Sequence, residues 1–136
     1  MASGTEPQVV VGAAVVREGR VLAARRTAPA SAAGRWEFPG GKVEPGETDD
    51  ESLVREVDEE LGVRIRVTRW LAGSEPLGDR YLLRVAVASL EGGEPVPTEH
   101  DEVRWLGADE LESVDWLDGD RPFLAELSTL LSTLEP

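Results

Sequence analysis

Residues 40–63 read GGKVEPGETDDESLVREVDEELGV, and this stretch predicts a glycine-rich loop followed by an amphipathic helix. Thr48 is a favoured N-cap residue, and Glu51, three residues later, completes a capping-box pattern. Acidic residues fill the first turn, where the helix dipole stabilises negative charge. Gly62 predicts the C-terminal end of the helix.

The two sides of this predicted helix have opposite characters. At about 100° per residue the apolar side chains form a stripe that would face a core. Three glutamates form a second stripe on the other side, with neighbouring Cβ atoms about 5–6 Å apart. Such carboxylates repel one another, whereas Mg²⁺ or Mn²⁺ would bind them together with phosphate oxygens. The alternative is a solvated acidic face. The apolar stripe is Leu53, Val54, Val57 and Leu61, and the acidic stripe is Glu56, Glu59 and Glu60.

The whole stretch resembles the Nudix box. Nine constrained positions match across twenty-three residues. The resemblance implies the Nudix fold, an α/β/α sandwich in which a mixed sheet lies between helices. It also implies hydrolysis of a nucleoside diphosphate linked to another group. The pattern is specific for the family but not for the substrate. The matching positions are Gly41, Glu47, Arg55, Glu56, Val57, Glu59, Glu60, Gly62 and Val63.

The resemblance also assigns a metal site. Metals that bridge phosphate oxygens lower the cost of developing charge and help to form hydroxide from water. The implied cofactor is Mg²⁺ or Mn²⁺. The implied ligands are the carboxylates of Glu56, Glu59 and Glu60 and the backbone carbonyl of Gly40.

Three further acidic or basic positions are expected to support this site. Glu47 is implied to be a supporting carboxylate that pairs with Arg55, and the pair would help to orient the metal ligands; an ordinary surface ion pair is the alternative. In the MutT branch of the family a glutamate just before a late strand joins the metal and catalytic site. Glu99 is our prediction for that position, and Asp101 or Glu102 are the alternatives.

Basic side chains near the loop are candidates for contacts with phosphate or sugar, with a solvated surface charge as the alternative for each. They are Arg26, Lys42 and Arg80. The only histidine, His100, is expected to be incidental, because metal and glutamate can activate water without an imidazole.

Residues 35–42, RWEFPGGK, are close to the form seen in MutT-like nucleoside triphosphate pyrophosphohydrolases, which release the monophosphate and pyrophosphate. In 8-oxoguanine-specific members an Asn at the N-terminus of the last helix reads the purine edge, and Asp120 stands there in this chain. An ionised carboxylate only accepts hydrogen bonds, so it matches the amino group of cytosine or adenine. Leu77 stands where purine-reading members have an aromatic residue.

These features resemble the subgroup that hydrolyses CTP, dCTP and 5-methyl-dCTP. Three alternatives remain open: a hydrolase of oxidised purine nucleotides such as 8-oxo-dGTP, a hydrolase of another nucleoside diphosphate such as a nucleotide sugar, and a module that senses nucleotides without cleaving them. For Asp120 a plain helix N-cap is the other interpretation.

The composition indicates one domain, residues 8–136, after a flexible tail at residues 1–7. The formal net charge of −13 disfavours binding to nucleic acid polymers and anionic membranes. The chain has no cysteine, so thiol chemistry is excluded. No signal peptide or membrane-spanning run is evident, which predicts a cytoplasmic protein. The oligomeric state is not indicated.

The remaining chain predicts strands and helices around this unit, with a break at residues 71–78. The last helix, at 120–133, would have Asp120 as its N-cap and Pro122 in its first turn. A short helical turn is expected at 108–113. The predicted strands or extended segments are 9–16, 21–26, 36–39, 63–70, 81–90 and 103–106.

Overall fold

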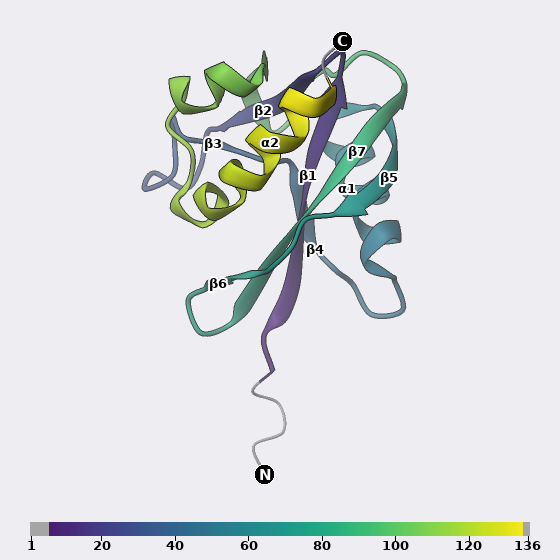
Figure 1. Cartoon of the computed structure of the whole chain (residues 1–136). Coiled ribbons are helices and arrows are strands. Elements are labelled where there is room, and N and C mark those ends of the chain that lie inside the picture. The colour runs from purple at the N-terminus through teal and green to yellow at the C-terminus, as the bar shows by residue number, and fades with distance from the viewer. Residues whose placement is uncertain (1–5, 135–136) are drawn as a thin grey trace.

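The computed structural model describes residues 6–134 and contains one mixed sheet with helices on both of its faces (Figure 1). Two 3₁₀ helices, η1 and η2, precede the last α-helix. In chain order the elements are β1 (Gln8–Arg17), β2 (Arg20–Arg26), β3 (Trp36–Glu37), β4 (Gly40–Lys42), α1 (Asp49–Leu61), β5 (Arg64–Trp70), β6 (Glu75–Leu77), β7 (Tyr81–Gly92), β8 (His100–Leu106), η1 (Ala108–Ser113), η2 (Asp118–Phe123) and α2 (Leu124–Leu134).

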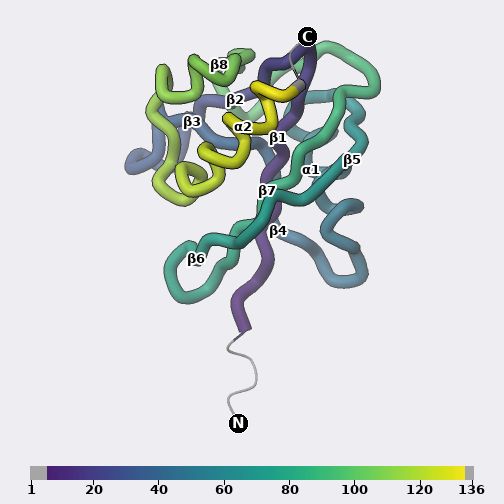
Figure 2. The backbone as a smooth tube through the Cα atoms, in the orientation of Figure 1, coloured from purple at the N-terminus to yellow at the C-terminus, as the bar shows by residue number. Residues whose placement is uncertain are grey.

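The centre of the sheet is a parallel pair, β1 and β7, in which Gln8–Val16 lie opposite Tyr81–Ser89. The main strand order is β3-β2-β1-β7-β5, while β4 pairs with β1, β6 with β7 and β8 with β2. Residues 11–15 of β1 are buried. A continuous apolar run is expected where both faces of a strand are covered. The tube in Figure 2 shows β6 returning alongside the beginning of β7, where it pairs with Tyr81–Leu83, while the start of β1 pairs with the other edge of the same part of β7.

Two hydrophobic clusters fill the space between the sheet and its helices. On one face α1 packs through Leu53, Val57 and Leu61, all fully buried. On the opposite face α2 packs through Leu127 and Leu131, together with side chains of the two 3₁₀ helices. The predicted α/β/α sandwich is therefore confirmed.

The predicted caps of α1 are present. The Glu51 backbone N–H donates to Thr48 Oγ1 (3.0 Å), and the Thr48 N–H donates to the Glu51 carboxylate (2.9 Å). Gly62 ends the helix in the left-handed region, with φ of 70°. Because both ends are set by local sequence, the helix and its row of glutamates have a defined start and stop.

Three element predictions were wrong in part. Residues 71–78 contain a short strand, β6, that pairs with β7. Gly40 and Gly41 form a strand rather than a loop, because β4 pairs with β1. The last α-helix begins at Leu124, not at Asp120, and the preceding turns are the 3₁₀ helix η2.

Asp120 is not the N-cap of a helix. It lies inside η2, and its carboxylate accepts a hydrogen bond from the Phe38 backbone N–H (3.4 Å). Pro122 lies inside η2, and the regular α-helix begins two residues after it, at Leu124. The Asp120 side chain is thus directed into the protein instead of back along its own helix.

Most of the predicted tail at residues 1–7 lies outside the described residues, and β1 begins at Gln8. Within residues 6–134, no helix has the length and apolar character needed to cross a membrane.

Candidate active site

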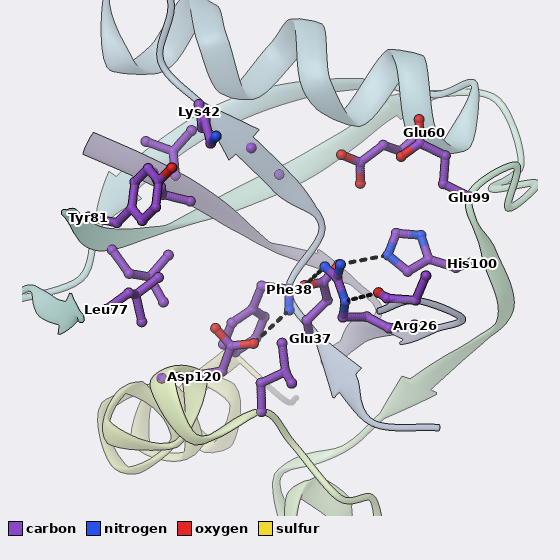
Figure 3. Close-up of a pocket in the computed structure, with 18 of the residues that line it drawn as sticks. Arg26, Glu37, Phe38, Lys42, Glu60, Leu77, Tyr81, Glu99, His100 and Asp120 are labelled. Carbon is purple, nitrogen blue, oxygen red and sulfur yellow. Dashed lines mark hydrogen bonds and ion pairs between the residues drawn. The ribbon is translucent and has the colours of Figure 1, made fainter. Parts of the chain in front are cut away.

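A cavity of about 640 Å³ opens between β4, the start of β8 and η2 (Figure 3). Acidic side chains line one end of it, and apolar side chains with one buried acid line the other. The lining residues are Val10, Val11, Arg26, Thr27, Ala28, Glu37, Phe38, Gly40, Gly41, Lys42, Glu60, Leu77, Tyr81, Leu83, Glu99, His100, Leu117, Gly119 and Asp120.

The acidic end is formed by Glu60 of α1 and Glu99, which lies just before β8. Glu60 is only 6% exposed, and its Oε1 is buried without a hydrogen-bond partner among the described residues. Burial, reinforced by the charges of Glu37, Glu56 and Glu99, raises the pKa of Glu60 to about 9. An unpaired buried carboxyl is costly, and a cation would relieve that cost.

Two glycines allow the backbone of β4 to come close to its neighbours. A Cβ on Gly41 would lie 2.4 Å from the Glu56 carboxyl carbon, and a Cβ on Gly40 would lie 1.9 Å from the Val11 carbonyl oxygen. The β4 backbone therefore runs directly beside the Glu56 carboxylate. Gly40 and Gly41 line the cavity together with Glu60 of α1, whereas the predicted ligands Glu56 and Glu59 lie outside its lining.

Arg55 is held by a two-pronged contact with Glu47, as predicted. Its Nε and Nη2 donate to the Glu47 carboxylate at 2.6 and 3.0 Å. This contact lowers the pKa of Glu47 to about 2 and raises the pKa of Arg55 above its ordinary value. Arg55 Nη1 also lies 3.3 Å from both Glu56 and Glu59, so one guanidinium orients three acids around the predicted metal site.

The donor set suits a hard divalent cation. Carboxylates and a backbone carbonyl are the oxygen ligands that Mg²⁺ and Mn²⁺ prefer, and the buried Glu60 oxygen is unpaired. Within residues 6–134, no three acidic or histidine side chains are close enough to surround an ion at once. Glu59, whose side chain is 57% exposed, would have to turn from Arg55 towards Glu60. The residues that could hold the ion are those predicted: Glu56, Glu59, Glu60, Glu99 and Gly40.

Of the three acids considered for this position, only Glu99 lines the cavity. Asp101 and Glu102 belong to β8, which begins at His100 and not at Val103 as predicted. Asp101 is turned outwards, and its carboxylate accepts from Arg25 Nε (2.7 Å). Glu102 accepts from Arg104 Nε (2.8 Å). The placement of these side chains supports the choice of Glu99.

The predicted substrate contacts are only partly brought together. Arg26, Lys42, Leu77 and Asp120 line the cavity, whereas Arg80 is exposed and does not. Lys42 Nζ lies 4.9 Å from the centre of the Tyr81 ring, a cation–π distance, at the end of the cavity that carries Leu77.

Asp120 is 5% exposed, and its surroundings favour the protonated form. Burial first, and then the charge of Glu37, raises the pKa of Asp120 to about 8. The sequence-based expectation treated this group as an ionised acceptor. At neutral pH the buried acid is mostly neutral, so it can donate one hydrogen bond and accept another.

Sequence reasoning gave no role to several residues that line the cavity. Glu37 and His100 interact with each other inside it, and Phe38 packs against Trp116 with ring centres 4.7 Å apart. Tyr81 and Leu83 add apolar surface at the Leu77 end. One signal was available for Glu37. It is an acid between two aromatic residues in an extended segment. If both faces of that segment are covered, an apolar side chain would be expected at this position.

Comparisons with known proteins show the family of the chain. The NUDIX domain family model matches residues 6–127. A Mycobacterium tuberculosis (strain H37Rv) protein with the provisional name 8-oxo-dGTP diphosphatase 2 is 42% identical over 131 residues, which are 92% of this chain and 91% of that protein. The CTP pyrophosphohydrolase of Escherichia coli (strain K12) is 47% identical over 66 residues, 48% of this chain and 49% of that protein.

A solved structure shows the same fold over nearly the whole chain. The solution structure of the E. coli ORF135 protein superposes with a TM-score of 0.81 at 30% identity, covering 98% of this chain and 97% of that one. Nudix hydrolases generally use a divalent metal such as Mg²⁺ and act on small-molecule nucleotides. The chain therefore belongs to the NUDIX domain family and is a Nudix nucleotide hydrolase.

Proposed function

We propose that this chain hydrolyses (deoxy)nucleoside triphosphates to the monophosphate and pyrophosphate with Mg²⁺, and that cytidine nucleotides are its preferred substrates. The candidates are CTP, dCTP and 5-methyl-dCTP. The observation that carries the proposal is the two-ended cavity, with Glu60 and Glu99 at one end and the buried Asp120 at the other. A triphosphate at the acidic end, bridged by metal, places its base near Asp120.

Each end has a separate task. The residues proposed to hold the metal are Glu56, Glu59, Glu60, Glu99 and the Gly40 carbonyl. When bound there, Mg²⁺ neutralises phosphate charge and lowers the pKa of water that is to attack phosphorus. Lys42, beside Tyr81 at the Leu77 end, offers the nucleotide a positive charge away from the metal in a chain that is otherwise strongly acidic.

The base end suits cytosine. A neutral carboxyl at Asp120 can donate its O–H to the cytosine ring nitrogen N3 and accept from the exocyclic amino group. Leu77 and Phe38 line the same cavity as this polar group and supply apolar contact surface. This pairing uses both hydrogen-bonding capacities of the acid, which would otherwise be costly to leave unmet in a buried site.

A nucleotide panel tests this proposal. With Mg²⁺ at pH 7, we expect kcat/KM for dCTP to exceed that for dATP, dGTP and dTTP by about tenfold or more, because a site that hydrogen-bonds one base leaves buried groups unpaired with another. Chromatography should show dCMP and pyrophosphate as products. Preference for 8-oxo-dGTP by orders of magnitude would refute the cytidine assignment.

That oxidised purine is the second candidate, for a specific reason. A neutral Asp120 can donate to a purine carbonyl oxygen as well as accept from a ring N–H, so the acid does not exclude guanine derivatives. The M. tuberculosis relative named above carries a name for that activity. A nucleotide sugar added to the same panel would reveal a hydrolase of another nucleoside diphosphate. A sensing module without hydrolysis is disfavoured by the full set of glutamates.

Gly41→Ala is expected to weaken the metal site without unfolding the protein. The added Cβ would displace the Glu56 carboxylate, which is the far end of a flexible side chain. We expect Mn²⁺ affinity to fall about 10- to 100-fold, the range found when groups supporting a metal site are disturbed. Titration calorimetry measures it.

Gly92→Ala is the matched control, because a Cβ there meets no atom within 4 Å and the residue has no positive φ. Equal Mn²⁺ affinity in both variants would contradict the placement of Glu56 at the metal.

A further inference from the structure

His100 is directed into the cavity by an irregularity of the sheet. In the β2–β8 ladder, Arg25 lies opposite Glu102, but Arg26 lies opposite His100, so Asp101 is an extra residue on β8. Bulges of this kind redirect side chains and are common next to active sites. Asp101 is exposed, while the His100 side chain is only 4% exposed and lines the cavity. Without this extra residue, the alternation of side chains along β8 would direct His100 to the opposite face of the sheet. The bulge therefore places the imidazole in the cavity.

The imidazole is bonded to Glu37. His100 Nε2 lies 2.8 Å from Glu37 Oε2, and Arg26 Nη1 donates to Glu37 Oε1 at 2.9 Å (Figure 3). A carboxylate that already accepts from a guanidinium has only acceptor positions, so Nε2 carries the hydrogen and donates it. The other ring nitrogen, Nδ1, is buried without a partner among residues 6–134. Within residues 6–134, Glu37 is therefore the only hydrogen-bond partner of the His100 ring.

Glu37 lies between the two ends of the cavity. Figure 3 shows its side chain between Asp120 on one side and Glu60 with Glu99 on the other. Glu37 lines the same cavity as Glu60, Glu99 and Asp120. A nucleotide that extends from the acidic end to Asp120 must pass beside this carboxylate. Each carboxylate oxygen retains a lone pair that can accept from a sugar hydroxyl or a base amino group.

We propose that His100 is a positioning residue: its Nε2–H holds the Glu37 carboxylate in the middle of the cavity, where that carboxylate contacts the bound nucleotide. This inference rests on the proposed function in one respect, namely that a nucleotide spans the cavity. Arg26 alone secures only one oxygen of Glu37, and the side chain can rotate about that contact. His100 secures the second oxygen and fixes the plane of the carboxylate.

Three substitutions at His100 separate this role from simple packing. The amide nitrogen of Gln can occupy the place of Nε2, whereas the amide of Asn reaches only the place of Nδ1, and Leu fills space without any donor. We expect His100→Gln to keep KM for the best (deoxy)nucleoside triphosphate within about threefold of wild type. His100→Asn and His100→Leu should raise KM about tenfold, the loss expected for one hydrogen bond to a charged group, while kcat changes less.

The chain offers a direct test that needs no substrate. His100 is its only histidine, so ¹⁵N-labelled protein without an affinity tag gives a single imidazole spectrum. Long-range ¹H–¹⁵N correlation should show hydrogen on Nε2 with restricted exchange in wild type. The exchange should become faster in Glu37→Leu, which removes the acceptor. A spectrum in which only Nδ1 carries hydrogen would overturn the proposal.

Failure of the proposed function and failure of the positioning role give different results. If wild type hydrolyses no nucleoside triphosphate, the proposed function fails, and the imidazole spectrum still decides whether His100 holds Glu37. If wild type is active and the Gln, Asn and Leu variants share one KM while remaining folded by circular dichroism, the positioning role is wrong. Rescue by Gln but not by Asn supports it, because a packing role does not depend on which end of the side chain carries the donor.

Discussion

Glu60→Gln is expected to abolish most of the activity and, without metal, to make the protein more stable. The variant keeps the size of the side chain but removes one carboxylate of the proposed metal site. We expect kcat to fall about 100- to 1,000-fold, as for other groups that stabilise charge developing in a transition state. Steady-state kinetics with the best nucleotide at saturating Mg²⁺ measure this effect.

The gain in stability follows from the raised pKa of Glu60. That pKa is about 9 in the folded chain against an ordinary value of 4.5. Between these values the folded protein holds a proton that the unfolded chain releases, so metal-free wild type loses stability as pH rises through this window. Gln has no proton to lose. At pH 8 without metal, Glu60→Gln should therefore unfold at a higher urea concentration than wild type, and Mg²⁺ should narrow the difference by stabilising wild type more than the variant.

Asp58→Asn is the matched control, because Asp58 lies on the same helix but is exposed and does not line the cavity. It should leave both kcat and urea stability near wild type. If Glu60→Gln turned over nucleotide at the wild-type rate, the proposed metal site would be in the wrong place.

The second large effect is expected at Asp120 above neutral pH. The ratio of kcat/KM for dCTP in wild type to kcat/KM for dCTP in Asp120→Asn should fall about tenfold between pH 7 and pH 9. The pKa of Asp120 is about 8, so the donor form needed for cytosine N3 becomes scarce over this range, whereas an amide retains both donor and acceptor. Taking the ratio of the two kcat/KM values cancels the pH effects that both enzymes share, including those of the metal site and of the hydroxide concentration.

Asp118→Asn serves as the control for this experiment. Asp118 is two residues away in η2, its side chain is 90% exposed, and it pairs with Arg35 outside the cavity. Its pH profile should follow wild type. A wild-type to Asp120→Asn ratio that stays flat from pH 7 to pH 9 would mean that Asp120 does not read the base as a neutral acid. Repeating the series with 8-oxo-dGTP shows which of the two substrate classes depends on this proton.

The parts of the structure that were predictable depend on interactions between close neighbours in sequence. The capping box of α1 joins Thr48 to Glu51, and Gly62 ends the same helix. Periodicity alone then separates the buried stripe from the glutamates. The Glu47–Arg55 contact also spans only eight residues. These features need no knowledge of how the chain folds back on itself.

The parts that were missed depend on distant partners. Glu37 and His100 are 63 residues apart in sequence, and Asp120 receives its hydrogen bond from a backbone group 82 residues away. Nothing beside Asp120 in the sequence indicates that it is buried, so its protonation could not be foreseen. The bulge at Asp101 is likewise a property of the paired strands, and without it a single histidine in a polar segment predicts nothing in particular.

The parallel pairing of β1 with β7 has a consequence for how the enzyme is made. Residue 8 lies opposite residue 81, so the two strands meet only after a long stretch of chain between them has been synthesised and its ends brought together. Parallel pairs of this kind close large loops and are slow to form. Both strands contribute walls to the cavity, Val10 and Val11 from the first and Tyr81 and Leu83 from the second. A nascent chain released before β7 would carry every glutamate of α1 and still have no place to bind a nucleotide.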